Sequence, residues 1–194
     1  IERGFRWIGV LVLLLVSFSA TAVTSVFSAD KIAGCAPLVV NFTPVDGPCS
    51  GCTYSWNFGT GSPVTGYTAS SSFLTAGVHV VTLTVTSGAL SSSSTRTITV
   101  YANPTVSFTT SDTAICPGKS ATFSNTSING ASGPATIKWS LGDGDTALVS
   151  PATHTYMFPG YYNVALSVTN SNGCTTTLTK TTLIHVFTPP VISF

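Results

Sequence analysis

The sequence predicts an all-β fold, and three observations lead to this prediction. Ser and Thr supply 58 of the 194 residues (26 Ser and 32 Thr), while apolar residues still make up 43% of the chain. Short segments alternate apolar and hydroxyl side chains, as half-buried strands do. The strong helix formers Glu, Lys and Met are scarce. The apolar content also argues against a disordered chain, because disordered chains lack it.

The charge content excludes one large class of function. The chain has 7 Lys and Arg and 6 Asp and Glu, and its formal net charge is +1. Proteins that bind nucleic acids by neutralising phosphates need clustered Lys and Arg, so nucleic acid is not expected as a partner. Many hydroxyl groups with few charges are typical of extracellular or cell-surface proteins, and the composition indicates no reaction.

The N-terminal part of the chain contains an uncharged run from Trp7 to Ala29. Basic residues precede it, its most apolar part is 7–16, and small residues follow, which predicts a signal peptide at 1–22 with cleavage after Ala22. The alternative is a retained apolar helix within residues 1–29, long enough to span a bilayer or to pack in the core of a filament. A membrane is an expected partner only if residues 7–29 are retained. Both interpretations place the rest of the chain outside the cytoplasm.

The remainder of the chain is an internal repeat with an offset of 83 residues. The segment Thr53–Gly61 recurs as Thr136–Gly144, and Gly77–Thr86 recurs as Gly160–Thr169. Each of these segments alternates apolar and polar residues, which predicts strands with one face toward a core.

A shorter segment also recurs and gives the domain boundaries. Pro104–Phe108, which opens the second unit, reappears as Pro190–Phe194. We therefore expect one domain at 31–102, a second at 103–188 and the start of a third repeat at 189–194.

Several short strands and an early Trp in some 80 residues suit a two-sheet sandwich of the immunoglobulin type. The two Trp residues are the expected centres of the two cores. The predicted core residues are Trp56, Phe58, Trp139, Leu141, Tyr156 and Tyr162.

The motifs of the second unit identify a family resemblance. After Trp139 come Gly142-Asp143-Gly144, His154-Thr155-Tyr156 and a Gly-x-Tyr-x-Val-x-Leu-x-Val segment that starts at Gly160. This pattern resembles the polycystic kidney disease (PKD) domain, an immunoglobulin-like sandwich. The first unit resembles a divergent copy, with Thr60, Phe73 and His79 at the positions of Asp143, Tyr156 and Tyr162.

The resemblance implies a secreted or cell-surface module without catalysis of its own. Similar PKD arrays occur in large bacterial surface proteins, including adhesins linked to gliding motility and type IX secretion. The expected role is that of a spacer or an adhesion unit, with neighbouring repeats, surface glycans, surface proteins or other copies of the chain as partners. Two alternatives stay open: a subunit of an extracellular filament with the N-terminal helix in its core, and the accessory domains of a larger secreted hydrolase.

Five Cys residues in an exported chain suggest disulfides. Cys116 precedes the first core strand of the second unit and Cys174 follows its last repeated strand, so we expect a bridge between them. Cys49 and Cys52 are expected to form a local bridge, because no second ligand pair follows that would complete a zinc site. Cys35, the counterpart of Cys116, is then free or paired with another chain.

The acidic and histidine residues give only weak site candidates. Asp143 and Asp145 are candidates for calcium, but calcium takes six to eight oxygen ligands and no third acid lies nearby in the sequence. We favour a structural role in which Asp143 bonds to the backbone of a tight turn. His79, His154 and His185 are isolated from one another, and His154 is expected to hydrogen-bond near that turn. No catalytic residue and no cofactor is predicted.

Tyr and Thr residues supply the last candidates. Tyr162 holds a position like the tyrosine corner, whose hydroxyl fixes a connection in a sandwich. Tyr161 should face the other way and could contact a sugar or a protein. Thr113 and Thr146 lie in Asp-Thr-Ala segments, which resemble the sites where some bacteria with type IX secretion attach O-glycans.

Overall fold

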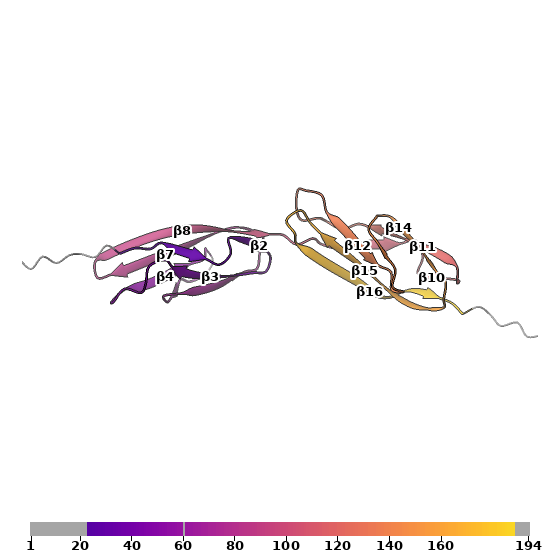
Figure 1. Ribbon diagram of the computed structural model, residues 1–194, viewed down its shortest axis with the longest axis horizontal. Helices are drawn as coiled ribbons and strands as arrows, with labels where there is room; N and C mark the ends of the chain where they lie inside the picture. Colours follow the sequence, from indigo (N-terminus) through magenta and orange to yellow (C-terminus); the bar gives the residue numbers. More distant parts are fainter. Residues whose placement is uncertain (1–22, 60, 189–194) are drawn as a thin grey trace, which may run out of the picture.

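The computed structural model describes residues 23–59 and 61–188, and these form sixteen strands and no helix. The strands build two sandwiches that lie end to end (Figure 1). The described residues include no membrane-spanning helix. The signal peptide predicted at 1–22 and the third repeat predicted at 189–194 lie outside the described residues.

The first domain has one sheet of three strands and one of five. The three-stranded sheet consists of β1 (Phe27–Ala29), β3 (Leu38–Pro44) and β6 (Ala69–Phe73), in the order β1-β3-β6. The five-stranded sheet has the order β2-β8-β7-β4-β5, with β2 (Ala33–Cys35), β8 (Leu90–Tyr101), β7 (Gly77–Ser87), β4 (Thr53–Asn57) and β5 (Val64–Thr65). All pairs are antiparallel except β2 with β8.

The second domain repeats this topology, with a parallel pair at the same place. Its three-stranded sheet has the order β14-β11-β9, with β14 (Ala152–Tyr156), β11 (Lys119–Asn125) and β9 (Phe108–Thr110). Its five-stranded sheet has the order β10-β16-β15-β12-β13, with β10 (Ala114–Ile115), β16 (Thr175–Val186), β15 (Gly160–Thr169), β12 (Thr136–Ser140) and β13 (Thr146–Ala147).

Strand β1 corrects one prediction about the N-terminal run. Phe27 is 2% exposed, lies in the first core, and begins a strand that pairs with β3. A retained helix therefore cannot extend to residue 29, because Phe27–Ala29 supply sheet hydrogen bonds and core volume. The first sandwich also begins before the expected boundary at residue 31.

Each core is built around one tryptophan. The ring of Trp56 lies edge-on to Phe27 at 5.1 Å between centroids and packs against Phe42 at 5.9 Å. Its indole N–H donates to the Gly66 carbonyl at 2.9 Å, which satisfies the polar atom of this fully buried side chain.

The second core has nearly the same arrangement. Trp139 lies 5.1 Å from Phe108 and 5.8 Å from Phe123, and its N–H donates to the Val149 carbonyl at 3.0 Å. Of the predicted core residues, five are buried and Tyr162 is partly buried against the second core. The five are Trp56, Phe58, Trp139, Leu141 and Tyr156.

Candidate functional site at the junction between the domains

A disulfide joins the two domains. Cys35 is the last residue of β2, and Cys174 lies in the turn between β15 and β16. They form a bond of 2.00 Å with their Cα atoms 5.6 Å apart, although 139 residues separate them in sequence. Cys174 is 1% exposed, so the bond lies within the junction. The sandwiches are thus linked covalently at a second point besides the main chain.

This pairing overturns the predicted Cys116–Cys174 bridge, which is wrong. Cys174 immediately precedes β16, whereas Cys116 follows Ile115, which pairs with Val186 at the other end of that strand. About a dozen residues of strand, at roughly 3.3 Å each, separate the two levels by nearly 40 Å. Disulfide Cα atoms lie within about 7 Å of each other, so the bond cannot form.

The sequence repeat explains why the Cys116–Cys174 bridge was predicted. The 83-residue repeat gives the order of the strands along the chain but not the end of the sandwich at which each turn lies. In Figure 1, β2 lies at the end of the first domain that faces the second, and β10 lies at the end of the second domain that faces away from the first. A cysteine after β2 therefore meets the hairpin of the next domain rather than a hairpin of its own.

Two asparagine side chains fix the short linker between the domains. Asn170, 4% exposed, donates from its amide to the Ala102 carbonyl at 2.8 Å. Its Oδ1 accepts the backbone N–H of Cys174 at 3.0 Å, which orients the amide beside the disulfide. From the linker itself, Asn103 donates to the Ala36 carbonyl at 2.5 Å. The linker is hydrogen-bonded to both domains.

A loop of the second domain also packs closely on this linker. Gly130 has φ +73°, and a Cβ added there would lie 2.8 Å from the Asn103 carbonyl oxygen. Close by, Thr105 and Ile128 exchange two backbone hydrogen bonds of 2.9 Å. Only glycine fits at position 130, because any side chain would push the loop away from the linker.

The turn that contains the calcium candidates is held by hydrogen bonds. Nε2 of His154 lies 2.6 Å from Oδ2 of Asp143, and Oδ1 of Asp143 accepts the Asp145 N–H at 3.2 Å. Partial burial alone would raise the pKa of Asp143, but the hydrogen bonds from His154 and the Asp145 N–H hold it below the ordinary value. The three side chains could together approach a metal ion. With two carboxylates and one imidazole, the cluster is far from the oxygen-rich set that calcium takes.

Two tyrosine hydroxyls support the same end of the second sandwich. Tyr156 donates to the buried Leu141 carbonyl at 2.9 Å, and burial raises the pKa of its phenol. Tyr162 donates to the Phe158 carbonyl at 2.7 Å, four residues upstream, as a tyrosine corner does. In the first domain His79 takes this place, with Nε2 at 2.9 Å from the Thr75 carbonyl.

Three rings form a row on the outer face of the second five-stranded sheet. Tyr161 stacks on His185 at 4.2 Å between centroids and 12° between planes, and Phe187 lies 4.4 Å from His185. Tyr161 is 66% exposed and Phe187 45%. The glycan candidates Thr113 and Thr146 are exposed as well.

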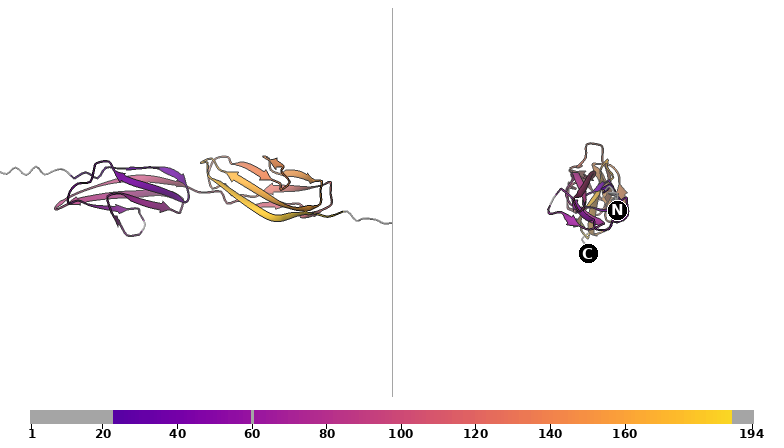
Figure 2. Two further views of the ribbon diagram at one scale, coloured as in Figure 1. Left: turned by 60° about the horizontal axis from the view of Figure 1, so that its bottom comes forward. Right: turned by 90° about the vertical axis from the view of Figure 1, so that its left-hand side faces the viewer.

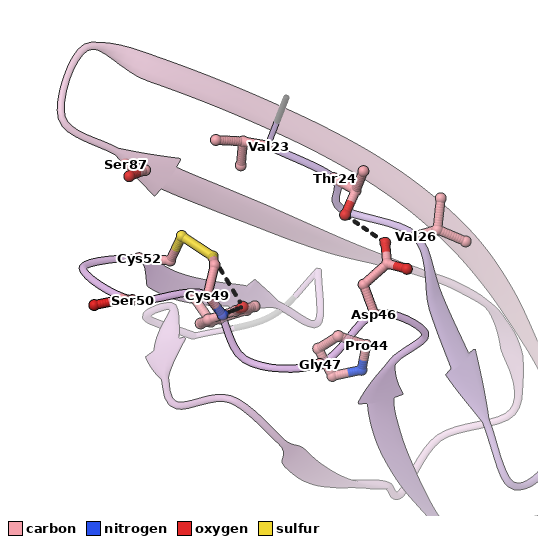
Figure 3. Close-up of a pocket in the computed structure, with 11 residues that line it drawn as sticks. Val23, Thr24, Val26, Pro44, Asp46, Gly47, Cys49, Ser50, Cys52 and Ser87 are labelled. Carbon is pink, nitrogen blue, oxygen red and sulfur yellow. Dashed lines mark hydrogen bonds between the residues drawn. A yellow bond between two sulfur atoms is a disulfide. The ribbon is translucent and has the colours of Figure 1, made fainter. Parts of the chain in front are cut away.

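A surface pocket of about 500 Å³ lies at the end of the first domain opposite the junction (Figure 3). It is lined by Val23, Thr24, Val26, Pro44, Asp46, Gly47, Cys49, Ser50, Cys52, Tyr54 and Ser87. Cys49 and Cys52 form a disulfide in its wall, which is the local bridge that the sequence predicts. Asp46 is the only charged residue of the lining and bonds to Thr24, so these residues contain no acid–base pair for catalysis.

Comparisons with known proteins agree with this description. The family model for the PKD domain matches residues 26–100, and a second PKD-domain model matches residues 101–186. A microbial collagenase of Vibrio alginolyticus is 41% identical over 68 residues, which are 34% of this chain and 8% of the collagenase. The chain thus spans less than a tenth of the length of that relative.

Solved structures give similar matches. The PKD1 domain of the Vibrio cholerae metalloprotease PrtV is 30% identical, with 44% of this chain and 99% of that domain covered and a TM-score of 0.38. Carbohydrate-binding modules of the β-sandwich superfamily are 28% identical, with 43% of this chain and 35% of theirs covered and a TM-score of 0.39. The chain belongs to the PKD-domain family and contains two PKD domains in tandem.

Proposed function

We propose that the two domains form a rigid, non-catalytic spacer in an extracellular protein, holding other parts of that protein at a set distance. The observation that carries the proposal is the Cys35–Cys174 disulfide between the domains. Structural disulfides persist in oxidising compartments outside the cytoplasm, which supports export. The similarity to parts of a collagenase and a metalloprotease supports a module attached to larger proteins.

The junction explains why the spacer would be rigid. Domains joined only by a short linker are expected to move relative to each other. Here a covalent bond and the side chains of Asn103 and Asn170 connect the linker region to both sides. Viewed along the long axis, one domain lies behind the other, so the pair is extended rather than folded back (Figure 2). A fixed joint of this kind keeps the two ends of the pair at a constant distance and in a constant orientation.

A second candidate role is that of accessory domains in a larger secreted hydrolase, which the collagenase similarity favours. In that role the pair would still space a catalytic domain from its substrate or from the cell. Adhesion through the row of Tyr161, His185 and Phe187, attachment of O-glycans at Thr113 and Thr146, a link to type IX secretion and assembly into a filament stay predictions.

Residual dipolar couplings measured by NMR test the rigid joint. In the oxidised chain, the couplings of both domains should fit one alignment tensor. In a Cys35→Ala/Cys174→Ala variant they should need two tensors of different magnitude, because the linker then retains only its hydrogen bonds. The Cys49→Ala/Cys52→Ala variant is the matched control and should keep one tensor. Two different tensors in the oxidised parent would overturn the proposal.

A further inference from the structure

Cys116 occupies in the second domain the place that Cys35 occupies in the first. Cys35 ends β2, which pairs in parallel with the end of β8 and brings Cys35 opposite Tyr101. Cys116 directly follows β10, which pairs in parallel with the end of β16. Both cysteines stand three residues before the next strand, β3 or β11. Cys116 is exposed and is the free cysteine of the described residues.

The inter-domain disulfide has a direction along the chain. The earlier domain contributes the cysteine after its short parallel strand, and the later domain contributes the cysteine of its last hairpin. The corresponding hairpin of the first domain, Ser87–Leu90, has no cysteine, so the same pairing cannot occur at that end. The second domain carries an unused cysteine at its far end. In the two described domains, Cys116 on the C-terminal side is therefore the cysteine that has no partner.

A second feature of the surface beside Cys116 is the ring of Phe187. Phe187 is 45% exposed at this end, and its backbone N–H donates to the Ile115 carbonyl at 3.0 Å. Its counterpart in the first domain is Tyr101, which is only partly exposed at the occupied junction. Phe187 thus occupies, in the second domain, the position that Tyr101 occupies at the junction of the first domain with the second.

We propose that Cys116 forms a second inter-domain disulfide with a cysteine in the last β-hairpin of a further PKD domain that follows Thr188. This inference rests on the proposed spacer function and extends it from one fixed joint to a series. The occupant is a PKD domain because Pro190–Phe194 repeats the segment that opens the second domain, Pro104–Phe108. The partner cysteine corresponds to Cys174.

The chemistry is thiol–disulfide exchange. The thiolate of one cysteine attacks the disulfide of a dithiol–disulfide oxidoreductase, and the second cysteine then displaces the enzyme's sulfur from the mixed disulfide. Two protons and two electrons leave the pair of thiols, and the oxidoreductase disulfide is reduced to a dithiol. An oxidoreductase of the same class supplies the oxidant for Cys35 and Cys174.

A tandem chain tests the proposal. A second copy of residues 103–188 is attached after Thr188, because Thr188 corresponds to Ala102, and the protein is produced in an oxidising compartment. Free thiols are alkylated in denaturant, and the disulfide-linked peptides are identified by mass spectrometry. We expect the original Cys116 peptide to be linked to the Cys174 peptide of the appended copy. With Cys174→Ser in that copy only, Cys116 should instead be alkylated.

The outcomes separate the two proposals. If Cys116 and Cys174 of the appended copy are both alkylated while Cys35 remains bonded, this inference is overturned and the spacer function stands. A Cys116 bond between two molecules overturns it as well. If Cys116 is bonded as expected but the dipolar couplings of the oxidised parent need two tensors, the spacer proposal fails alone. In the full-length native protein, a Cys116 peptide linked to a peptide beyond Phe194 supports the inference, and an alkylated Cys116 contradicts it.

Discussion

The two domains have the same aromatic core but different hydrogen bonds around it. The Phe–Trp pairs that cross each sandwich have the same separation, 5.1 Å, and planes at 83° and 85°. At the corner before the long hairpin, the ring of His79 hydrogen-bonds to a backbone carbonyl in the first domain, and the hydroxyl of Tyr162 does so in the second. The two domains thus have the same core shape, whereas the corner accepts any side chain that is long enough to hydrogen-bond to the backbone carbonyl.

The same exchange occurs on the edge of the small sheets. In the first domain, Asp30 accepts the Asn41 N–H at 2.8 Å, and in the second, Ser111 accepts the Thr122 N–H at 3.1 Å. A carboxylate and a hydroxyl perform the same task with different pH dependence.

The largest expected effect comes from truncating either tryptophan. Trp56→Ala and Trp139→Ala should each destabilise their own domain by about 3–5 kcal/mol, because each leaves a cavity between two phenylalanine rings. Since the two cores share their geometry, the two losses should agree within about 1 kcal/mol. Hydrogen exchange of amides in β4 and β12 measures each domain separately. A clearly smaller loss for one of them would show that its core is not packed alike.

Removing the buried phenol of the second domain should have the next largest effect. Tyr156→Phe leaves the buried Leu141 carbonyl without its hydrogen bond, which costs about 1–3 kcal/mol. The first domain already has Phe73 at this position, so the change makes the second domain resemble the first. Tyr67→Phe, which removes a 2.7 Å bond to the exposed Asp46 carbonyl, is the control and should cost less. Equal losses in urea denaturation would contradict a special role for the buried bond.

The corner bond should contribute less, since it lies near the surface. Tyr162→Phe should destabilise the second domain by about 1 kcal/mol. Tyr162→His copies the arrangement of the first domain and should restore part of the loss through the Phe158 carbonyl. Thermal unfolding followed by NMR measures both variants. A histidine variant less stable than the phenylalanine variant would show that the corner needs a phenol.

The sequence contains enough information for the fold because the fold depends on periodic patterns. Alternation identifies β7 and β15, and the two Trp positions identify the cores, since strand side chains must alternate between core and solvent. The hydrogen-bonded role of Asp143 also follows from the Gly-Asp-Gly turn. These features depend on neighbours in sequence or on a repeated motif.

The junction depends on residues far apart in sequence, so it is harder to predict. Cys35 and Cys174 are 139 residues apart, and their contact depends on how one sandwich follows the other. The residues around Cys174 do not indicate whether its partner is Cys116 of the same domain or Cys35 of the preceding domain. The available signal was the direction of the strands, since a hairpin at the start of β16 points back toward the first domain. Asn170 carried no signal, because its role depends on the linker that it contacts.

The smallest expected effect concerns pH. The folded pKa of Asp143 lies below the ordinary value of 3.8 after partial burial is offset by the bonds from His154 and Asp145. The stabilisation is therefore present above about pH 4 and is lost as the pH falls through the lower folded value. Asp30 of the first domain also has a lowered pKa, because the Asn41 backbone and side chain bond to it. Each domain should then lose stability in acid through its own carboxylate.

Two asparagine variants separate these contributions. Asp143→Asn should reduce the acid sensitivity of the second domain only, by at most about 1 kcal/mol for so exposed a group. Asp30→Asn is the matched control and should reduce the acid sensitivity of the first domain only. Amide exchange of each domain between pH 2 and pH 5 gives both values in one sample. If Asp143→Asn left the second domain as acid-sensitive as the parent, the Asp143–His154 bond would contribute nothing to stability, and the Gly-Asp-Gly turn would depend on its backbone alone.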